Sequence, residues 1–254
     1  MTSLSPNNVT EANRQYYNQV ASEYMKNEAY AYTPTIKKNV IELLTFASSH
    51  APSRDMFLDF GCGSGFLSSL VSTHKLMESG IGIDISEEQI KLYNENLDGT
   101  RFLGEVGDIT ATSKKDKSID MAAGYSVLHH FYNFNNVILE ITRLLKQGGV
   151  FYVDFEPNQQ FKQIFALPIA LRRRFFDLSP NNNDSLEQLA EYHNNFEPGI
   201  CRKKLLRFLE DDYAILKTGC RIPSLKYEAD ICLQLLSKVS FVFSPCFFVI
   251  ARKK

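Results

Sequence analysis

Short apolar segments alternate with amphipathic ones along most of this chain. Residues 56–60, 80–85, 102–106, 118–125 and 150–155 are mostly apolar and short. Runs of this kind are typical of strands in a parallel sheet that helices cover on both faces. Between these runs, apolar residues recur at three- and four-residue steps, as in 137–145, which predicts helices. The alternation therefore predicts an α/β fold.

The pattern outside this central part predicts the remaining elements of one domain, without internal repeats or long linkers. We expect disorder in residues 1–10 and N-terminal lid helices within residues 1–50. The central strands lie within 54–157, and the apolar segment 158–200, interrupted by Pro168, predicts a helical cap after the fifth strand. The C-terminal part, 201–254, reads as helix 201–209, strand 212–218, helix 229–236 and last strand 246–252.

A glycine-rich turn follows the first of these strands. Residues 61–65 have the pattern G-x-G-x-G, and near-helical spacing of apolar residues begins at Phe66. Glycine tolerates positive φ and has no Cβ, so the backbone of such a turn approaches a ligand closely. Strand, glycine turn and helix together predict a nucleotide-binding crevice. The pattern departs from both the dinucleotide motif G-x-G-x-x-G and the phosphate-binding P-loop.

Acidic residues occur at or near the ends of three successive strands. Asp59 lies in the first strand, Asp84 ends the second and Asp108 follows the third. The carboxyl ends of neighbouring strands form the crevice where open α/β sheets bind ligands. Asp84 lies 84 − 65 = 19 residues beyond Gly65, near the spacing at which an acid meets a ribose in dinucleotide folds. The alternative roles are helix capping for Asp84 and turn formation for Asp108.

Composition excludes several classes of protein. The formal net charge of −1 gives no global attraction to nucleic acid, and the 44% hydrophobic content is ordinary for a globular domain. The five cysteines form no C-x-x-C pair, so neither a disulfide framework nor a metal site is predicted. The N-terminus lacks the apolar core of a signal peptide and no apolar run is long enough to span a membrane. These features predict a cytoplasmic protein.

The stretch from Leu58 to Gly65 resembles the signature loop of class I S-adenosylmethionine (SAM)-dependent methyltransferases. The Leu-His-His of 128–130, with Asp120 at the start of its strand, resembles those members that act on small molecules, and residues 55–157 carry the family's motifs in order. The resemblance implies a Rossmann-like, doubly wound, mostly parallel seven-stranded sheet with an antiparallel last strand. It also implies SAM as the cofactor and S-adenosylhomocysteine (SAH) as a product, and makes 54–157 the SAM-binding half.

The resemblance also assigns the cofactor site residue by residue. In the family, a tyrosine like Tyr24 contacts the SAM carboxylate, an acid like Asp84 binds the ribose and an acid like Asp108 meets the adenine amine; Met25 stands where the family usually has aspartate. The expected cofactor-binding residues are Tyr24, Asp59, Gly61, Cys62, Gly63, Gly65, Asp84, Ile85, Asp108, Ile109 and Tyr125.

Three histidines are candidates for a general base, because histidine titrates near neutral pH. His129 and His130 lie in the loop after the fourth strand, which should face the crevice, with His129 as the first choice, and His193 lies in the expected cap. A histidine in such a loop also commonly makes a backbone hydrogen bond, and some acceptors need no base.

The cap predicts the acceptor class. Its Phe, Leu and Ile residues, followed by Arg172 to Arg174, could form an apolar wall with a cationic rim; simple packing on the sheet and an interfacial membrane helix are the alternatives.

We therefore expect a SAM-dependent methyltransferase acting on a small, apolar or amphipathic acceptor through an O, N or C nucleophile. The expected protein is a monomer or homodimer without nucleic-acid partner, integral membrane segment or metal. A nicotinamide-dependent oxidoreductase and a non-catalytic SAM-binding protein are the alternative functions.

Overall fold

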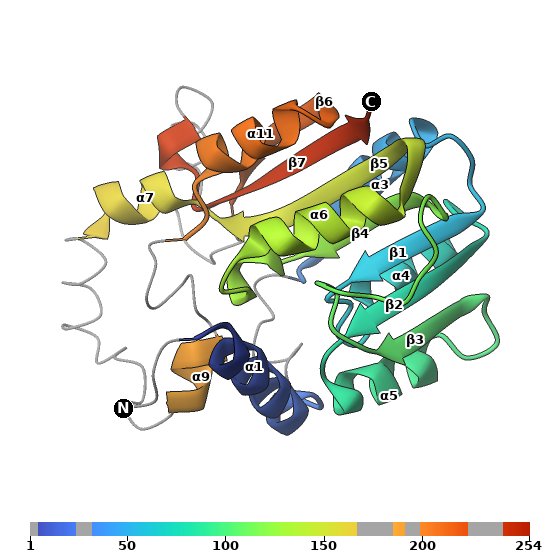
Figure 1. Ribbon diagram of the computed structural model, residues 1–254, viewed down its shortest axis with the longest axis horizontal. Helices are drawn as coiled ribbons and strands as arrows, with labels where there is room; N and C mark the ends of the chain where they lie inside the picture. The colour runs from blue at the N-terminus through green and yellow to red at the C-terminus, as the bar shows by residue number, and fades with distance from the viewer. Residues whose placement is uncertain (1–4, 24–31, 167–184, 191–198, 223–240) are drawn as a thin grey trace.

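The computed structural model describes residues 5–23, 32–166, 185–190, 199–222 and 241–254 (Figure 1). Its centre is a seven-stranded sheet. The strands are β1 (Met56–Phe60), β2 (Ser79–Asp84), β3 (Phe102–Val106), β4 (Ile119–Tyr125), β5 (Leu145–Pro157), β6 (Tyr213–Arg221) and β7 (Cys246–Lys253). The helices are α1 (Pro6–Val20), α3 (Pro34–Ser49), α4 (Phe66–Thr73), α5 (Glu87–Asn96), α6 (Phe134–Leu144), α7 (Gln159–Ile164), α9 (Ser185–Ala190) and α11 (Arg202–Glu210), with short 3₁₀ turns η2 (Leu128–His130) and η3 (Phe241–Phe243).

The strand order β3-β2-β1-β4-β5-β7-β6 turns back between β1 and β4. The pairs β1·β2, β2·β3, β1·β4 and β4·β5 are parallel, whereas β7 is antiparallel to both β5 and β6. The model therefore confirms the predicted mostly parallel sheet with an antiparallel last strand. Because β1 and β4 are neighbours whose connections leave in opposite directions, their carboxyl ends open a crevice.

Helices cover both faces of the sheet. One face packs its apolar side chains against α3, α4 and α5, and the other packs against α6 and α11. Each helix contributes the residues of one face, such as Val40 and Leu44 of α3 or Val137 and Ile141 of α6. The sheet is thus buried on both sides, which explains why its central strands are so apolar in sequence.

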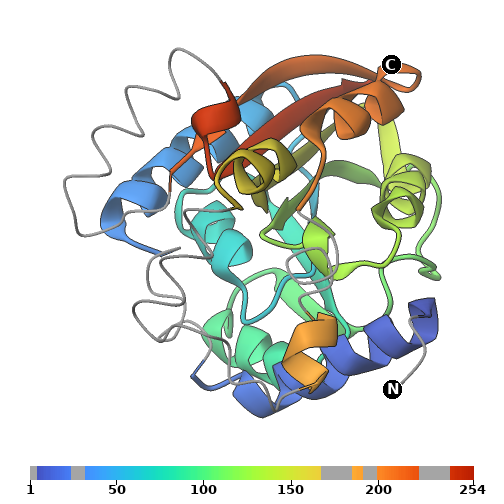
Figure 2. The same cartoon turned by 90° about the vertical axis from the view of Figure 1, so that its left-hand side faces the viewer.

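Helices α1 and α9 lie side by side beyond the carboxyl edge of the sheet rather than on either face (Figures 1 and 2). Helix α1 begins at Pro6, so the expectation of disorder in residues 1–10 is wrong for the described residues 5–10. Ser5 caps the helix by accepting a hydrogen bond from Asn8 N, and Pro6 occupies its first turn. Serine followed by proline is a helix-start signal, and the sequence contained it.

Other boundaries differ from the predicted ones by a few residues. Strand β6 extends to Arg221, and Leu128 to His130 form η2 rather than an open loop. Tyr24, His193, the expected helix 229–236 and most of the cap lie outside the described residues. Within the described part of the chain, every helix is too short or too polar to cross a membrane.

Candidate functional site

A pocket lies at the carboxyl edge of the sheet, between the glycine turn and helix α1. Its walls come from the turn after β1, the ends of β2 and β3, the loop after β4 and one face of α1. The lining residues that the following argument uses are Asn13, Tyr17, Tyr32, Asp59, Gly63, Phe66, Asp84, Gln89, Asp108, Tyr125, Ser126 and His130.

The glycine turn has the conformation that its sequence predicts. Gly61, Gly63 and Gly65 have φ values of 62°, 48° and 92°, in the region that side chains disfavour. A Cβ on Gly61 would collide with Val127 Cγ2 at 2.1 Å, so Gly61 is needed for packing. A Cβ on Gly63 would meet only Gln89 Oε1, at 3.7 Å, so this glycine leaves its backbone open to the pocket.

Asp59 is a buried acid that caps helix α4 from outside the helix. Gly65 at the start of α4 supplies no side-chain cap, and Asp59 Oδ2 accepts hydrogen bonds from Ser68 N at 3.0 Å and Ser68 Oγ at 2.7 Å. The side chain is 2% exposed. Burial is the main cause that raises the pKa of Asp59 to about 7, against the opposing effect of the Ser68 hydrogen bonds.

Asp84 joins the glycine turn to helix α5. Its Oδ2 accepts a hydrogen bond from Gly63 N at 2.9 Å, and its Oδ1 accepts one from Ser86 N at 2.9 Å. Burial raises the pKa of Asp84 from its usual value, although hydrogen bonds from Ser86 and Gly63 oppose this rise. Each carboxylate oxygen keeps capacity for a further donor, because a carboxylate has about four lone-pair positions.

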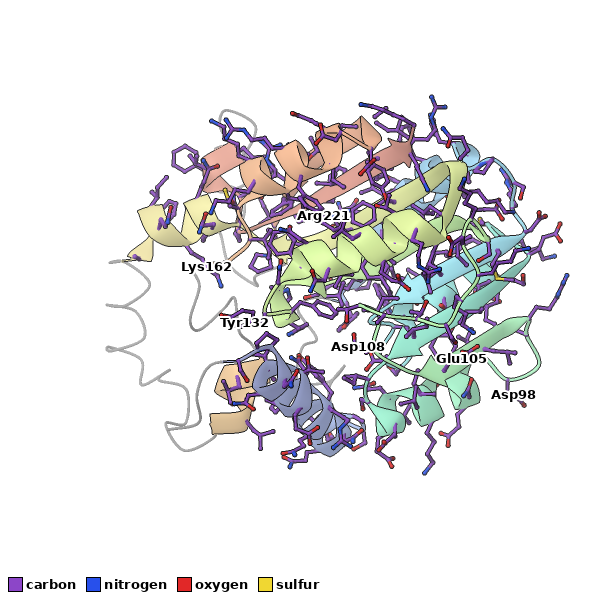
Figure 3. All side chains as sticks on the ribbon, viewed as in Figure 1. Asp98, Glu105, Asp108, Tyr132, Lys162 and Arg221 are labelled. Carbon is purple, nitrogen blue, oxygen red and sulfur yellow. The ribbon has the colours of Figure 1, made fainter. Side chains whose placement is uncertain are left out.

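The pocket lining is acidic. Asp108 adds a third carboxylate from the end of β3, where it accepts hydrogen bonds from Thr110 N and Oγ1, and Figure 3 shows it at the crevice between the sheet and α1. Among the described residues that line the pocket, none is lysine or arginine. Two of the three carboxylates have pKa values raised by burial, so the site favours a ligand that brings positive charge.

Helix α1 forms the roof of the pocket through one face. Asn13 Nδ2 donates to the carbonyl oxygen of His130 at 3.1 Å, and Tyr17 Oη lies 3.3 Å from His130 Nε2. Near the C-terminal end of α1, Asn18 Oδ1 accepts hydrogen bonds from Ser86 Oγ at 2.7 Å and Glu88 N at 3.2 Å. The helix is therefore attached both to the loop after β4 and to the start of α5.

The two adjacent histidines face different surroundings. His130 lines the pocket, and its Nδ1 and Nε2 lie 3.0 Å from Ala190 O and 3.1 Å from Ser126 O. His129 is 4% exposed and does not line the pocket; its Nδ1 lies 3.0 Å from Glu156 Oε2. This placement disfavours the expected role of His129 as a base that contacts the acceptor.

Glu156, at the end of β5, holds the loop that presents His130. Its Oε1 accepts hydrogen bonds from the backbone N–H groups of Val127 and Leu128, both at 2.9 Å. Burial is the largest influence on its pKa and would raise it, but the hydrogen bond and charge of His129 and the two backbone donors together lower the pKa of Glu156. A fully buried carboxylate is thus kept ionised by three hydrogen bonds.

Aromatic side chains form the wall beside the glycine turn. The rings of Tyr32, Phe66 and Tyr125 contact one another, with centroid separations of 4.8 Å, 4.9 Å and 5.9 Å, and Tyr125 stacks on Phe155 at 5.3 Å. Burial raises the pKa of Tyr125 well above its usual value, so its hydroxyl stays neutral. This wall is apolar along most of its surface.

The described ends of the expected cap lie in two places. Helix α7 packs against η3. The ring of Phe165, which follows α7, lies 6.2 Å from that of Phe243 in η3 and 4.6 Å from that of Phe161, and neither Phe161 nor Phe165 lines the pocket. Helix α9 instead packs along α1, and its Ala190 carbonyl oxygen meets His130. Of the described cap segments, only α9 therefore reaches the neighbourhood of the pocket.

Most of the expected cofactor residues share this pocket. Asp59, Gly61, Cys62, Gly63, Asp84, Ile85, Asp108, Ile109 and Tyr125 line it. Gly65 does not line it and instead starts α4, and Tyr24 lies outside the described residues. The sequence analysis missed Asn13, Tyr17 and Gln89. Their three- and four-residue spacing on helices was visible, but which face meets the pocket depends on the fold.

Comparisons with known proteins agree with this geometry. The family model described as "Methyltransferase domain" matches residues 58–153. The ubiquinone biosynthesis O-methyltransferase of Pelagibacter ubique is 26% identical in an alignment of 174 residues, and the match covers 61% of this chain and 72% of the relative.

Other similarities are more partial. The phthiotriol/phenolphthiotriol dimycocerosates methyltransferase of Mycobacterium tuberculosis is 29% identical over 106 residues, and the match spans 41% of this chain and 38% of that relative. Among solved structures, the geranyl diphosphate C-methyltransferase of Streptomyces coelicolor A3(2), in complex with Mg²⁺, geranyl diphosphate and SAH, has a TM-score of 0.58 at 17% identity. That similarity covers 91% of this chain and 84% of the other, and it shows a shared fold.

Proposed function

The chain carries a class I SAM-dependent methyltransferase domain, and we propose that it transfers the methyl group of SAM to a small, apolar or amphipathic acceptor. The observation that carries this proposal is the pocket itself. It combines an open glycine turn, three strand-end carboxylates and an aromatic wall, and its described lining lacks lysine and arginine.

The residues of this pocket fit SAM. Asp59 and Asp84 are partly or fully buried carboxylates with raised pKa values, and SAM brings a sulfonium and an ammonium group that would complement them. The same residues do not suit the pyrophosphate of a nicotinamide dinucleotide, which is anionic. Asp84 has the remaining acceptor capacity to bind ribose hydroxyls, and Asp108 offers an acceptor for the adenine amine.

The aromatic wall supports an apolar acceptor. Tyr32, Phe66 and Tyr125 present ring surface beside the turn, and rings of this kind bind apolar groups by area and by edge-to-face contacts.

Bound SAM supplies an activated methyl group, so the protein has chiefly to position the acceptor, exclude water and accept a proton where one is released. Correct positioning alone can contribute about 7–11 kcal/mol to lowering a barrier. Helix α1 and the loop 126–130, joined by the Asn13 hydrogen bond to His130 O, enclose the pocket and hold its walls in place.

His130 and Tyr17 form a route for that proton. Nδ1 and Nε2 each lie near a carbonyl oxygen, which only accepts hydrogen bonds, so the neutral ring donates to one of the two. In the tautomer that is protonated at Nδ1 and donates to Ala190 O, the Nε2 lone pair accepts a hydrogen bond from the Tyr17 hydroxyl. A proton released by the acceptor passes to the Tyr17 oxygen while Tyr17 gives its own to Nε2. The resulting imidazolium has both N–H groups paired, because Ser126 O lies 3.1 Å from Nε2.

Calorimetric titration tests the proposed function. We expect the purified full chain to bind SAM and SAH and to show no measurable binding of NADH. Incubation with SAM and a panel of acceptors should then produce SAH with hydrophobic hydroxyl, amine or enol compounds in preference to polymeric or highly charged ones. Binding of NADH in place of SAH would refute the proposal, and SAH binding without turnover on any acceptor would favour a non-catalytic SAM-binding protein.

Substitution of Gly63 by alanine is expected to weaken SAH binding about tenfold. The added Cβ projects into the pocket, where the backbone should approach the cofactor, and the position has φ of 48°. Gly99→Ala is the matched control, because Gly99 has φ of 72°, nothing lies within 4 Å of its added Cβ, and it does not line the pocket. Both variants should lose about 1 kcal/mol of stability from backbone strain. Equal SAH affinity in the two would mean that the turn is not the cofactor site.

Substitution of Asp84 by alanine is expected to lower SAH affinity about 10- to 100-fold, because each hydrogen bond to a charged group contributes about 1.5–3 kcal/mol. Unfolding should also become easier by about 1–3 kcal/mol, since Gly63 N and Ser86 N lose their acceptor. Calorimetry and thermal unfolding measure the two effects. Asp98→Ala, an exposed carboxylate far from Asp108 in Figure 3, is the control. Reduced stability with unchanged SAH affinity would restrict Asp84 to a structural role.

A further inference from the structure

Gln89 carries a buried side-chain carbonyl oxygen that has no hydrogen-bond partner among the described residues. The residue is 2% exposed. Among the buried side-chain nitrogen and oxygen atoms of the described residues, Gln89 Oε1 is the one without a hydrogen bond. Burying a polar atom without a partner costs stability, so such atoms are rare and need an explanation.

The start of helix α5 shows why Oε1 has no partner. Ser86 is the N-cap, its Oγ accepts a hydrogen bond from Gln89 N at 3.2 Å, and Gln89 occupies the third helical position. In a capping box, glutamine at this position accepts a hydrogen bond from the N–H of the N-cap residue. Here Ser86 N donates to Asp84 Oδ1 instead, at 2.9 Å. The carboxylate of Asp84 therefore takes the usual partner of Gln89.

The side-chain amide of Gln89 lies at the pocket wall near Gly63, the residue whose backbone N–H also binds Asp84. Gln89 lines the pocket, and its Oε1 would lie 3.7 Å from a Cβ built on Gly63. Gly63 N donates to Asp84, so it does not serve Gln89. A hydrogen-bond donor of a ligand that approaches the backbone of Gly63 beside Asp84 would meet Oε1.

We propose that Gln89 is a ribose-binding residue whose Oε1 accepts a hydrogen bond from one hydroxyl of the SAM ribose, next to Asp84. The proposal rests on the proposed function. The two ribose hydroxyls are donors on adjacent carbons, and two acceptors are available side by side. Asp84 already accepts one backbone N–H on each oxygen, whereas Gln89 Oε1 has its full capacity.

This role has a thermodynamic signature that ordinary core packing lacks. Methionine has nearly the shape of glutamine and no carbonyl, so Gln89→Met removes the unsatisfied atom from the ligand-free protein. The melting temperature of the ligand-free variant should rise by at least about 2 °C. The affinity for SAH should nevertheless fall about 3- to 10-fold, because the hydroxyl loses its acceptor.

The experiment measures thermal unfolding without ligand and calorimetric binding of SAH, 2′-deoxy-SAH and 3′-deoxy-SAH to the wild type and to Gln89→Met. One of the deoxy compounds should bind both proteins equally, because it lacks the hydroxyl that Gln89 accepts. Lys91→Met introduces methionine at an exposed position of the same helix and is the control. It should change neither the melting temperature nor the affinity for SAH.

Two results would overturn the proposal while the wild type still binds SAH. An unchanged SAH affinity in Gln89→Met would assign Gln89 to the core. An equal loss of affinity for SAH and both deoxy compounds in Gln89→Met would show that Gln89 shapes the pocket without binding a ribose hydroxyl. Absence of SAH binding by the wild type would instead refute the proposed function, and the role of Gln89 with it.

Discussion

Replacement of His130 by alanine is expected to lower the maximal rate of methyl transfer to a hydroxyl acceptor about 10²- to 10⁴-fold, the usual contribution of a general base. The ring lines the pocket, lies 3.3 Å from Tyr17 Oη and has a carbonyl oxygen ready for each N–H of its protonated form. The affinity for SAH should stay within about threefold, because the carboxylates and the glycine turn remain in place.

Steady-state rates at saturating SAM across the pH range measure this effect. The acidic limb of the wild-type profile should disappear in His130→Ala. Tyr17→Phe keeps the ring that meets His130 edge to face at 5.3 Å and removes only the hydroxyl, so it should lower the rate while the protein stays folded. His74→Ala, an exposed histidine after α4, is the matched control. A full rate for His130→Ala at every pH would show that proton removal is unnecessary or occurs elsewhere.

Replacement of Glu156 by alanine is expected to lower the free energy of unfolding by about 3–5 kcal/mol, as for loss of one partner from a buried charged pair. The N–H groups of Val127 and Leu128 and the ring of His129 would all lose their acceptor inside the protein. Denaturant unfolding measures the change. Glu95→Ala, an exposed carboxylate on α5, should remain within about 0.5 kcal/mol of the wild type.

The pH dependence identifies the charge of Glu156 as the cause. The pKa of Glu156 in the folded protein is lowered from the usual value of 4.5, so its ionised form contributes stability above that pH. The contribution is lost as the pH falls through the lowered pKa. Glu156→Gln keeps an acceptor for the backbone donors and has no charge, so the wild type should approach this variant in stability as the pH falls below 4.5 and through the lowered pKa of Glu156. A stability difference that stays constant from pH 7 to pH 3 would contradict this explanation.

Glu156 also supports the loop that carries the proposed base, His130. Glu156 holds the loop 127–129, and this loop leads directly into His130. His129 therefore acts in the structure as a partner of Glu156, one residue away from the side chain that reaches the pocket. The sequence analysis chose His129 because the loop was expected to face the crevice. In a 3₁₀ turn, adjacent side chains point in different directions, and long-range contacts decide which of them enters the pocket.

Local patterns in the sequence determined the central fold and the position of the three carboxylates in the pocket. Apolar strands, amphipathic helices and the glycine turn depend on residues that are neighbours in the chain, and parallel strands bring their carboxyl ends to one edge. Asp59, Asp84 and Asp108 could therefore be assigned to one pocket before the fold was known, and all three line it. The start of α1 was also encoded locally, by Ser5 and Pro6.

Only the tertiary structure decided which side chains complete the pocket. Asn13 and His130 meet across 117 positions of sequence, and Glu156 reaches back 27 positions to His129. The partner of Gln89 was predictable as Ser86 N, yet Asp84 occupies that donor once β2 and α5 are in place. Hydrogen bonds of this kind depend on competition between groups that folding brings together, whereas helix and strand patterns depend on spacing along the chain. The sequence consequently determined where the pocket lies, and the packing of α1, β5 and α9 around it determined which groups line it.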